Sequence, residues 1–202
     1  KMRKIVLFVF FSTLLLSSNA QNAYLLTGSN FSTYHFNSPM TTPLESGTGN
    51  FYEIGYSMQL KPKNLFYNVG INVNEYNAYA HSTANNYEWN TKYLGIQNAL
   101  EYRIALGEQL SLNVQAGINI SSIVYGRQQI NGVYYNLMKQ DEFSYVNIDP
   151  YARLQLAYKI GDLGCMSVGY GFCKSFFWMN NTSEKLSITT NQLVFGIHLN
   201  IN

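Results

Sequence analysis

The sequence predicts an all-β chain: an eight-stranded antiparallel up-and-down transmembrane β-barrel, preceded by a cleavable signal peptide. Three observations predict it. The first 20 residues are laid out like an export signal. The rest of the chain alternates apolar and polar residues over long segments, and very short polar turns alternate with longer polar stretches. We therefore expect a signal peptide at 1–20 and an outer-membrane β-barrel at 21–202.

The amino-acid composition argues against an ordinary soluble enzyme. Of the 202 residues, 47% are hydrophobic, 15% aromatic and only 12% charged, whereas soluble domains carry about 25% charged residues. The formal net charge of +2 provides no basic face of the kind that binds nucleic acid. We expect no nucleic-acid partner.

The N-terminal segment has the three parts of a Sec-type signal peptide. Lys1, Arg3 and Lys4 precede the apolar run Ile5–Leu16, which is followed by the small-residue site Ser18-Asn19-Ala20. The apolar run is too short for a membrane helix, which needs about 20 residues. Removal of residues 1–20 would leave 10 Lys and Arg against 11 Asp and Glu, a net charge of −1.

Alternation with a period of two predicts how the exported chain crosses a membrane. Residues 109–124 alternate apolar side chains with small or polar ones, and the same pattern recurs at 65–74 and 193–202. Ordinary strands have about five or six residues, and these segments are much longer. Because no later segment approaches 18 consecutive apolar residues, a spanning chain must form a closed barrel.

Polar punctuation gives the number of strands. Short turns are expected at Lys61–Asn64, Gly107–Gln109 and Gly161–Gly164, and longer loops at Asn37–Asn50, Ala80–Asn90, Gly126–Glu142 and Met179–Lys185. The eight predicted strands are 22–36, 50–61, 64–79, 91–106, 109–125, 143–160, 164–178 and 187–201. Short turns are periplasmic in transmembrane barrels, so we expect both termini on that side.

Two local signals refine this topology. Asn131-Gly132, inside the longest loop, favours a tight hairpin turn and predicts that the flanking strands continue above the membrane. Pro150 falls inside a predicted strand, where it cannot donate a ladder hydrogen bond. We expect a bulge or a local break at Asp149-Pro150.

The last strand contains Gly196-x-x-Leu199-x-Ile201. With the signal peptide, the strand count and the loop asymmetry, this segment makes the whole mature chain resemble the small eight-stranded outer-membrane barrels of OmpA/OmpX type, and more particularly the outer-membrane β-barrel domain proteins of Bacteroidota. The resemblance implies residence in a Gram-negative outer membrane. It also implies that Gly196, Leu199 and Ile201 form an assembly signal for the barrel-insertion machinery. Such a resemblance identifies architecture and leaves activity open.

Aromatic residues near the strand ends predict two girdles at the membrane–water interfaces. The girdle beside the short turns is expected to contain Tyr56, Tyr67, Tyr102 and Tyr158. The girdle beside the long loops is expected to contain Tyr76, Tyr79, Trp89, Tyr125, Phe143, Phe176 and Trp178. The same rings, clustered at one rim, could instead form a contact surface.

Charged residues of the opposite parity are expected inside the barrel. They are Glu53, Glu101, Arg103, Asp149, Arg153 and Lys159, joined by His198. Because eight strands enclose only enough space for side chains, we expect opposite charges to pair and form a lumenal polar plug. The alternative is a conductive path or proton relay. Lumenal glycines are expected to make room for the long side chains.

The residues that could carry chemistry are few. Cys165 and Cys173 lie eight residues apart on one predicted strand, about 26 Å, too far for a disulfide, so we expect free thiols and no metal or cofactor. His35 and His81 lie near the long-loop rim, where Ser32, Ser82 or Glu184 could complete an acyl-transfer or deacylation site. No triad order or spacing supports such a site.

The sequence thus favours one class of function and leaves a second open. The favoured class is a non-enzymatic outer-membrane protein with a structural or surface-recognition role through its loops, or an accessory subunit of a larger outer-membrane assembly. The alternative is an outer-leaflet lipid-modifying enzyme, an acyltransferase or deacylase, at the extracellular rim. Expected partners are outer-membrane lipid, the insertion machinery and other outer-membrane proteins.

Overall fold

The computed structural model describes residues 21–36, 44–81, 85–140, 143, 146–177 and 186–201. These residues form nine strands and one short 3-10 helix: β1 (Gln21–Phe36), β2 (Glu45–Gln59), β3 (Leu65–His81), β4 (Asn86–Ala105), β5 (Leu110–Ile130), β6 (Val133–Asn136), η1 (Leu137–Lys139), β7 (Asn147–Ile160), β8 (Gly164–Phe177) and β9 (Leu186–Ile201). The expected signal peptide lies outside the described residues and stays a prediction. No helix among the described residues is long and apolar enough to span a membrane.

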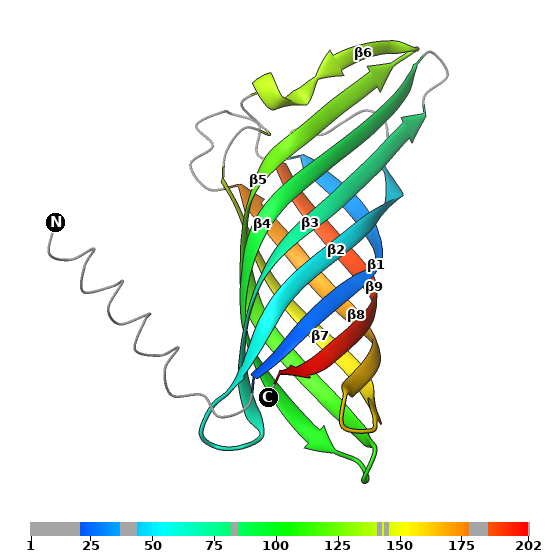
Figure 1. Cartoon of the computed structure of the whole chain (residues 1–202). Coiled ribbons are helices and arrows are strands. Elements are labelled where there is room, and N and C mark those ends of the chain that lie inside the picture. Colours follow the sequence, from blue (N-terminus) through cyan, green and yellow to red (C-terminus); the bar gives the residue numbers. More distant parts are fainter. Residues whose placement is uncertain are drawn as a thin grey trace, which may run out of the picture.

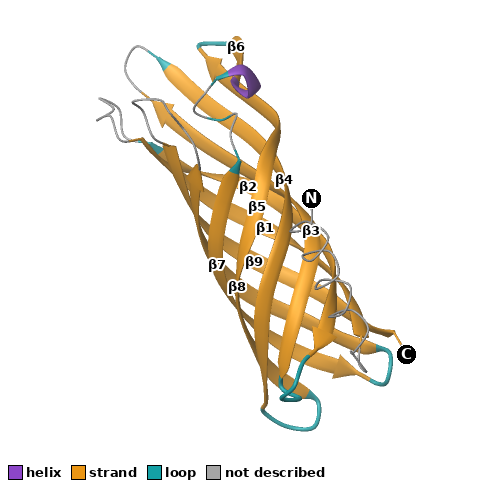
Figure 2. Ribbon diagram, turned by 90° about the vertical axis from the view of Figure 1, so that its left-hand side faces the viewer, coloured by secondary structure: helices purple, strands orange, loops and turns teal. Residues whose placement is uncertain are grey.

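Eight of the strands close into an antiparallel up-and-down barrel (Figures 1 and 2). Each strand pairs with its neighbours in the order β4-β3-β2-β1-β9-β8-β7-β5, and a β4–β5 pairing completes the ring. The ninth strand, β6, pairs only with β5. The predicted eight-stranded barrel is confirmed.

The short turns and both described ends of the barrel lie at one end, and the β5–β6 hairpin lies at the other (Figure 1). We call these the turn end and the loop end. Three short connections, at 60–64, 106–109 and 161–163, occupy the turn end. Gln21 of β1 pairs with Ile201 of β9 there, so the first and last strands meet along their whole length.

Strands reach further at the loop end than the sequence pattern predicts. The loop predicted at 80–90 shrinks, because β3 continues to His81 and β4 begins at Asn86. The predicted hairpin is confirmed: β5 runs to Ile130, β6 returns from Val133, and the turn residues Asn131 and Gly132 have φ of 50° and 86°. Positive φ at both central positions is the geometry that favours Asn-Gly.

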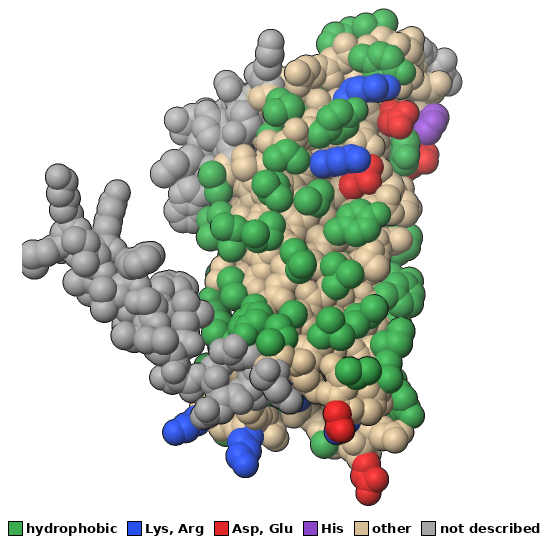
Figure 3. Space-filling view, viewed as in Figure 1, with side chains coloured by type: hydrophobic (Ala, Val, Ile, Leu, Met, Phe, Trp, Pro, Cys, Tyr) green, Lys and Arg blue, Asp and Glu red, His purple; other side chains and the backbone are tan. Residues whose placement is uncertain are grey.

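Side-chain parity sorts the barrel into a polar inside and an apolar outside. On β4 the outward positions from Leu94 to Ile104 are mainly apolar and exposed. These ten residue steps span roughly 33 Å along the strand, or about 25 Å along the membrane normal at a tilt near 40°. That height matches the apolar band of a transmembrane barrel, and many apolar side chains lie on the visible face of the barrel (Figure 3).

The register between β4 and β5 shifts at one position, and this shift alters which residues of β5 point inward. On β5 the pairing with β4 shifts between Lys92–Tyr125 and Tyr93–Ile123, so Val124 is an extra residue. Beyond this bulge, the outward-facing positions of β5 are Tyr125 and Arg127 rather than even-numbered residues. Both cluster on the outer surface below the hairpin.

The Pro150 prediction is confirmed as a local break. Pairing of β7 with β8 is interrupted between Ile148–Phe176 and Tyr151–Cys173, although the register is the same on both sides. On its other side, Pro150 remains aligned with Ile118 of β5. Because no residue is inserted, inward parity continues to Arg153.

The seam between β1 and β9 is tight at Gly28. A Cβ atom placed there would overlap the Leu193 carbonyl oxygen on the neighbouring strand. Only a residue without a side chain allows the two backbones to pair in the observed register. In contrast, a Cβ at Gly107, in a turn-end connection, would meet no atom within 4 Å.

We therefore predict that Gly28→Val prevents barrel closure and that Gly28→Ala lowers the folded yield several-fold, whereas Gly107→Ala leaves it unchanged. Folded transmembrane barrels migrate differently on SDS gels before and after heating, and this shift measures the yield. Wild-type yield for Gly28→Val would contradict the seam constraint.

Candidate functional site

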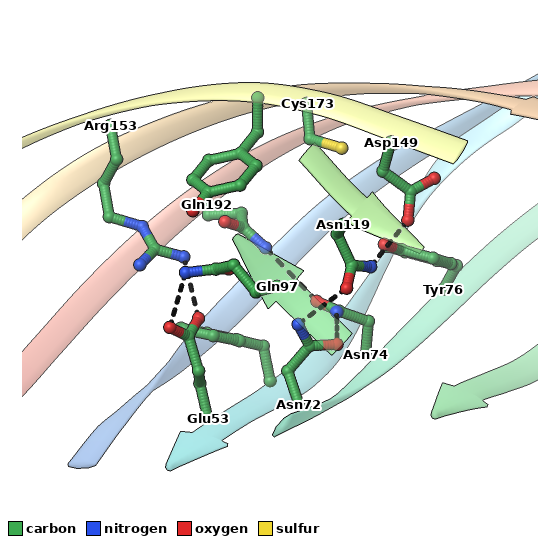
Figure 4. A pocket seen from close by; sticks show the side chains of 12 residues that line it. Glu53, Asn72, Asn74, Tyr76, Gln97, Asn119, Asp149, Arg153, Cys173 and Gln192 are labelled. Carbon is green, nitrogen blue, oxygen red and sulfur yellow. Dashed lines mark hydrogen bonds and ion pairs between the residues drawn. The ribbon is translucent and has the colours of Figure 1, made fainter. Parts of the chain in front are cut away.

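The lumen is built around one buried ion pair. Arg153 on β7 and Glu53 on β2 lie across the barrel from each other, with Nη2 and Oε2 3.3 Å apart and both side chains at most 2% exposed. Gln97 donates to the second Glu53 oxygen at 2.6 Å, and Arg153 donates to Gln115 Oε1 at 3.3 Å. The predicted residues Glu53 and Arg153 are thus brought together at the centre of the plug (Figure 4).

A second ion pair lies nearer the turn end. Arg103 Nε donates to Glu101 Oε1 at 2.5 Å, and the guanidinium lies 3.6 Å from the centroid of the Phe66 ring. Asn68 donates to the other Glu101 oxygen at 2.8 Å. Glu101 is buried, while Arg103 keeps partial exposure.

Asp149 differs from the other lumenal carboxylates, because no cation pairs with it among the described residues. Its Oδ2 accepts hydrogen bonds from Asn119 Nδ2 at 2.8 Å and from Ser121 Oγ at 3.2 Å. At this oxygen, hydrogen bonds therefore take the place of an ion pair.

A chain of amides continues from Asp149 across the barrel (Figure 4). It runs through Asn119, Asn72, Asn74, Asn30 and Gln192, with separations of 2.8–3.3 Å. The sequence analysis missed this chain. The signal was available, since Asn and Gln repeatedly occupy the inward parity of β3 and β5.

Two further predicted plug residues lie at the turn end, with different outcomes. His198 is buried, and its Nε2 lies 3.2 Å from Ser167 Oγ. Lys159 is not in the lumen: its side chain is 56% exposed and its Nζ lies 4.0 Å from Asp162 in the adjoining turn. Lys159 has the inward parity, but it falls so close to the strand end that the side chain reaches water.

Little space remains within this polar plug. The cavity between the Glu53–Arg153 pair and the amide chain has a volume of about 20 Å³, enough for about one water molecule. Gly55 and Gly70 leave space for Tyr24, because a Cβ at Gly55 would overlap its ring and a Cβ at Gly70 would overlap its hydroxyl. The lumenal glycines therefore make room for large side chains.

The loop end of the lumen is closed by an apolar cluster, which we call the loop-end cluster. Its buried members are Tyr34, Tyr76, Ala78, Ala80, Trp89, Tyr93, Ile123, Leu137, Phe143, Leu186 and Ile188. Leu137 belongs to η1 and Phe143 to the connection that follows, so the segment between β6 and β7 contributes to the closure. Tyr34 also hydrogen-bonds Thr91 at 2.7 Å.

The loop-end cluster corrects part of the predicted aromatic girdle. Trp89, Tyr76 and Phe143 were expected to face lipid, but all are at most 3% exposed. The strands extend beyond the apolar band, and there the inward aromatic rings fill the barrel mouth. Trp178 lies outside the described residues.

The other girdle residues lie on the outer surface. Tyr67, Tyr102 and Tyr158 point outward near the turn end, and Tyr67 donates to Asn98 at 2.5 Å. Tyr79 has outward parity at the loop end and is partly exposed. In the predicted assembly segment, Leu199 and Ile201 face outward, whereas Gly196 faces Leu26 and Ser167.

The rim histidines do not share a site with Ser32. Ser32 is buried on the lumen side, where its hydroxyl donates to the Asn77 carbonyl at 2.7 Å, while His35 is exposed with the opposite parity. His81 lies 3.9 Å from Glu45, and both are exposed. Ser82 and Glu184 lie outside the described residues.

The structure also shows the state of the two cysteines and the grouping of the side chains that could bind a metal. Cys165 and Cys173 are both free thiols on β8. Across the described part of the chain, no three His, Cys, Asp or Glu side chains converge in a group that could hold a metal ion.

These features define a class: the chain has the fold of an eight-stranded outer-membrane β-barrel with a filled lumen. Among solved structures it is similar to neisserial surface protein A, with a TM-score of 0.53 and 12% identity over 88% of this chain and 96% of that one. It is also similar to OprG of Pseudomonas aeruginosa, with a TM-score of 0.56 and 8% identity over 90% and 97%. At these identities the likeness concerns the fold.

Sequence comparison adds no family. No family model matches the chain, and no curated protein matches its sequence. Among solved structures, the outer-membrane enzyme PagL is also similar, with a TM-score of 0.41 and 14% identity over 87% of this chain and 98% of that one. A likeness of that extent carries no conclusion about activity.

The central ion pair gives a stability prediction. Glu53→Gln leaves the Arg153 charge buried and unpaired, so we expect about 3–5 kcal/mol of destabilisation. The double variant Glu53→Gln/Arg153→Met should lose less than the sum of the two single variants. Urea unfolding of the barrel in lipid vesicles measures the free energy of unfolding of Glu53→Gln, Arg153→Met and the double variant. The control is the exposed pair Lys159→Gln/Asp162→Asn, whose stability we expect to be unchanged. Additive losses in the lumen would contradict coupling.

The filled lumen also predicts transport behaviour. Because the central cavity holds about one water molecule and the loop-end cluster closes one mouth, we expect no steady porin-like conductance in planar bilayers. Large, steady currents from purified, gel-shifted protein would show that the plug opens.

Proposed function

We propose that this chain is a non-enzymatic integral protein of the outer membrane that acts in surface recognition through its extracellular end. The observation that carries this proposal is the division of the molecule: its lumen is filled, while its strands rise past the apolar band into the β5–β6 hairpin. Val133, Tyr134, Tyr135 and Met138 are exposed on and beside this hairpin. Exposed aromatic residues of this kind are enriched at protein contacts.

The proposal also covers the orientation of the barrel in the membrane, the group of proteins to which the chain belongs and its partners. The turn end would face the periplasm and the loop end the exterior, as is usual for such barrels. We further propose that the chain belongs among the OmpA/OmpX-type barrels, and more particularly the outer-membrane β-barrel proteins of Bacteroidota, with a structural or recognition role that includes that of an accessory subunit in an outer-membrane assembly. Partners would be outer-membrane lipid, the barrel-insertion machinery and other envelope proteins.

A photo-crosslinking residue tests the recognition role. Tyr135 lies on one face of the hairpin, opposite Gln128 of β5, and is exposed. We expect a crosslinker at Tyr135 to capture one defined macromolecule on intact cells, and the same crosslinker at Glu108, in a turn-end connection, not to capture it. Identical products at both positions would contradict recognition through the extracellular end.

The enzyme alternative is tested by lipid chemistry. A general base must lie within about 3 Å of its nucleophile or water, and His35 and His81 are the rim candidates. We expect the lipid A species of expressing cells to be the same with wild-type protein, His35→Ala, His81→Ala and no protein. A protein-dependent lipid change that disappears in either variant would establish a lipid-modifying enzyme.

A further inference from the structure

Two outward cations lie where the apolar band ends at the loop end. Lys92 is two residues beyond Leu94 on the outer face of β4, and Arg127 lies on β5. Lys92 is aligned with Tyr125 and Arg127 with Asn90, so the two cations are diagonal neighbours on adjacent strands. Basic and acidic side chains cluster on the upper part of this face (Figure 3).

Each cation lies near an aromatic ring rather than a carboxylate, and the contact is close only for Arg127. Lys92 Nζ lies 5.9 Å from the centroid of the Tyr125 ring, and Arg127 Cζ lies 3.5 Å from that of Tyr134 on β6. Within the described residues, neither cation has a carboxylate oxygen within 4.0 Å. Their charge is therefore available to an external anion.

Two acids lie beside this pair without forming an ion pair with it. Glu75 is aligned with Lys92 across β3 and β4, yet its carboxylate accepts hydrogen bonds from Asn90 at 3.0 Å and from the Asn50 backbone at 3.4 Å. Glu88 is close on the same face, and its carboxylate also remains beyond 4.0 Å of Arg127. The two acids bring the formal charge of the four side chains to zero, but the N–H groups of Lys92 and Arg127 are not engaged in an ion pair with them.

The surface beside Arg127 is hollowed on both sides. One cavity, of about 280 Å³, is lined by Tyr125, Arg127, Tyr134, Tyr135 and Met138 together with Gly126 and Asn136. Another, of about 200 Å³, is lined by Glu88, Asn90, Tyr125, Arg127 and Gln129. Arg127 and Tyr125 therefore stand between two concave regions large enough for polar groups.

This hollowed surface is continuous with the face that contacts lipid tails. Val124 and Leu94, directly below the cations, are exposed and apolar. A ligand bound at Arg127 and Lys92 would thus be placed with its charged group at the headgroup level and its apolar part against the barrel wall. Only an amphiphile uses both surfaces.

We propose that Lys92, Tyr125, Arg127 and Tyr134 bind the phosphate of an outer-leaflet lipid headgroup. A guanidinium offers two parallel donors to phosphate oxygens, and Tyr134 holds it in one plane while Lys92 adds a second positive charge. Cations near a membrane surface attract anionic lipid, and the amphipathic tyrosine rings suit the interface. The site goes beyond recognition by the hairpin, and it uses the loop-end orientation proposed above.

Lipid retention in native mass spectrometry tests the site. The protein is folded in mixed micelles containing equal amounts of bisphosphorylated lipid A and the same lipid A with both phosphates removed. We expect wild-type protein to retain the phosphorylated lipid preferentially, and Lys92→Gln/Arg127→Gln to retain it about 30-fold less. Arg127→Lys should show an intermediate loss, because it keeps the charge without the paired donors.

A matched variant controls for net charge. Lys61→Gln/Lys63→Gln removes the same two charges at the exposed turn-end connection and should retain phosphorylated lipid like wild type. Heat-dependent gel mobility confirms that each variant is folded. The proposal is overturned if the two lipids are retained equally, if both double variants lose lipid to the same extent, or if excess inorganic phosphate displaces the lipid completely. The last result would assign the site to free phosphate. Failure of this test would leave the crosslinking result at Tyr135 unaffected.

Discussion

Closure of the hydrogen-bonded ladder between β1 and β9 is the constraint on which the rest of this structure depends. Lipid tails offer no partners to backbone N–H and C=O groups, so a chain that spans with strands must leave no edge unpaired. The seam meets this requirement from Gln21–Ile201 to Phe36–Leu186 without a register change, and Gly28 permits the close approach. With the ring closed, every inward side chain must be accommodated in a narrow lumen.

The contents of the lumen follow from that confinement. Apolar residues are needed on the outside, so alternation places polar residues inside, where they can replace water only by bonding one another. Arg153 and Glu53 form the buried centre, and the amide chain from Asp149 links polar side chains that the ion pairs do not reach. The loop-end cluster then excludes water from one mouth. The recognition and lipid-binding roles that we propose therefore use the outer surface and the projecting hairpin.

Sequence reasoning was strongest where a single physical rule decides the outcome. Period-two alternation located the barrel strands, Asn131-Gly132 located the hairpin, and Pro150 located the break in the β7–β8 ladder. The prediction of which solvent a side chain meets was wrong at the strand ends. Trp89 turned inward because β4 extends past the apolar band, and Lys159 reached water because its strand ends nearby. Parity states which side a residue faces, but the height of the residue relative to the membrane decides what it meets there.

The candidate sites were less predictable because they combine residues that are distant in the sequence. Lys92 and Arg127 become neighbours only through the β4–β5 register, which the bulge at Val124 sets. The most direct test of the central claim is amide hydrogen exchange of the barrel in lipid nanodiscs. The closed seam predicts that amides between Leu25 and Phe31 on β1 exchange as slowly as those of β4 and β5. Rapid exchange confined to β1 and β9, with β4 and β5 protected, would contradict closure.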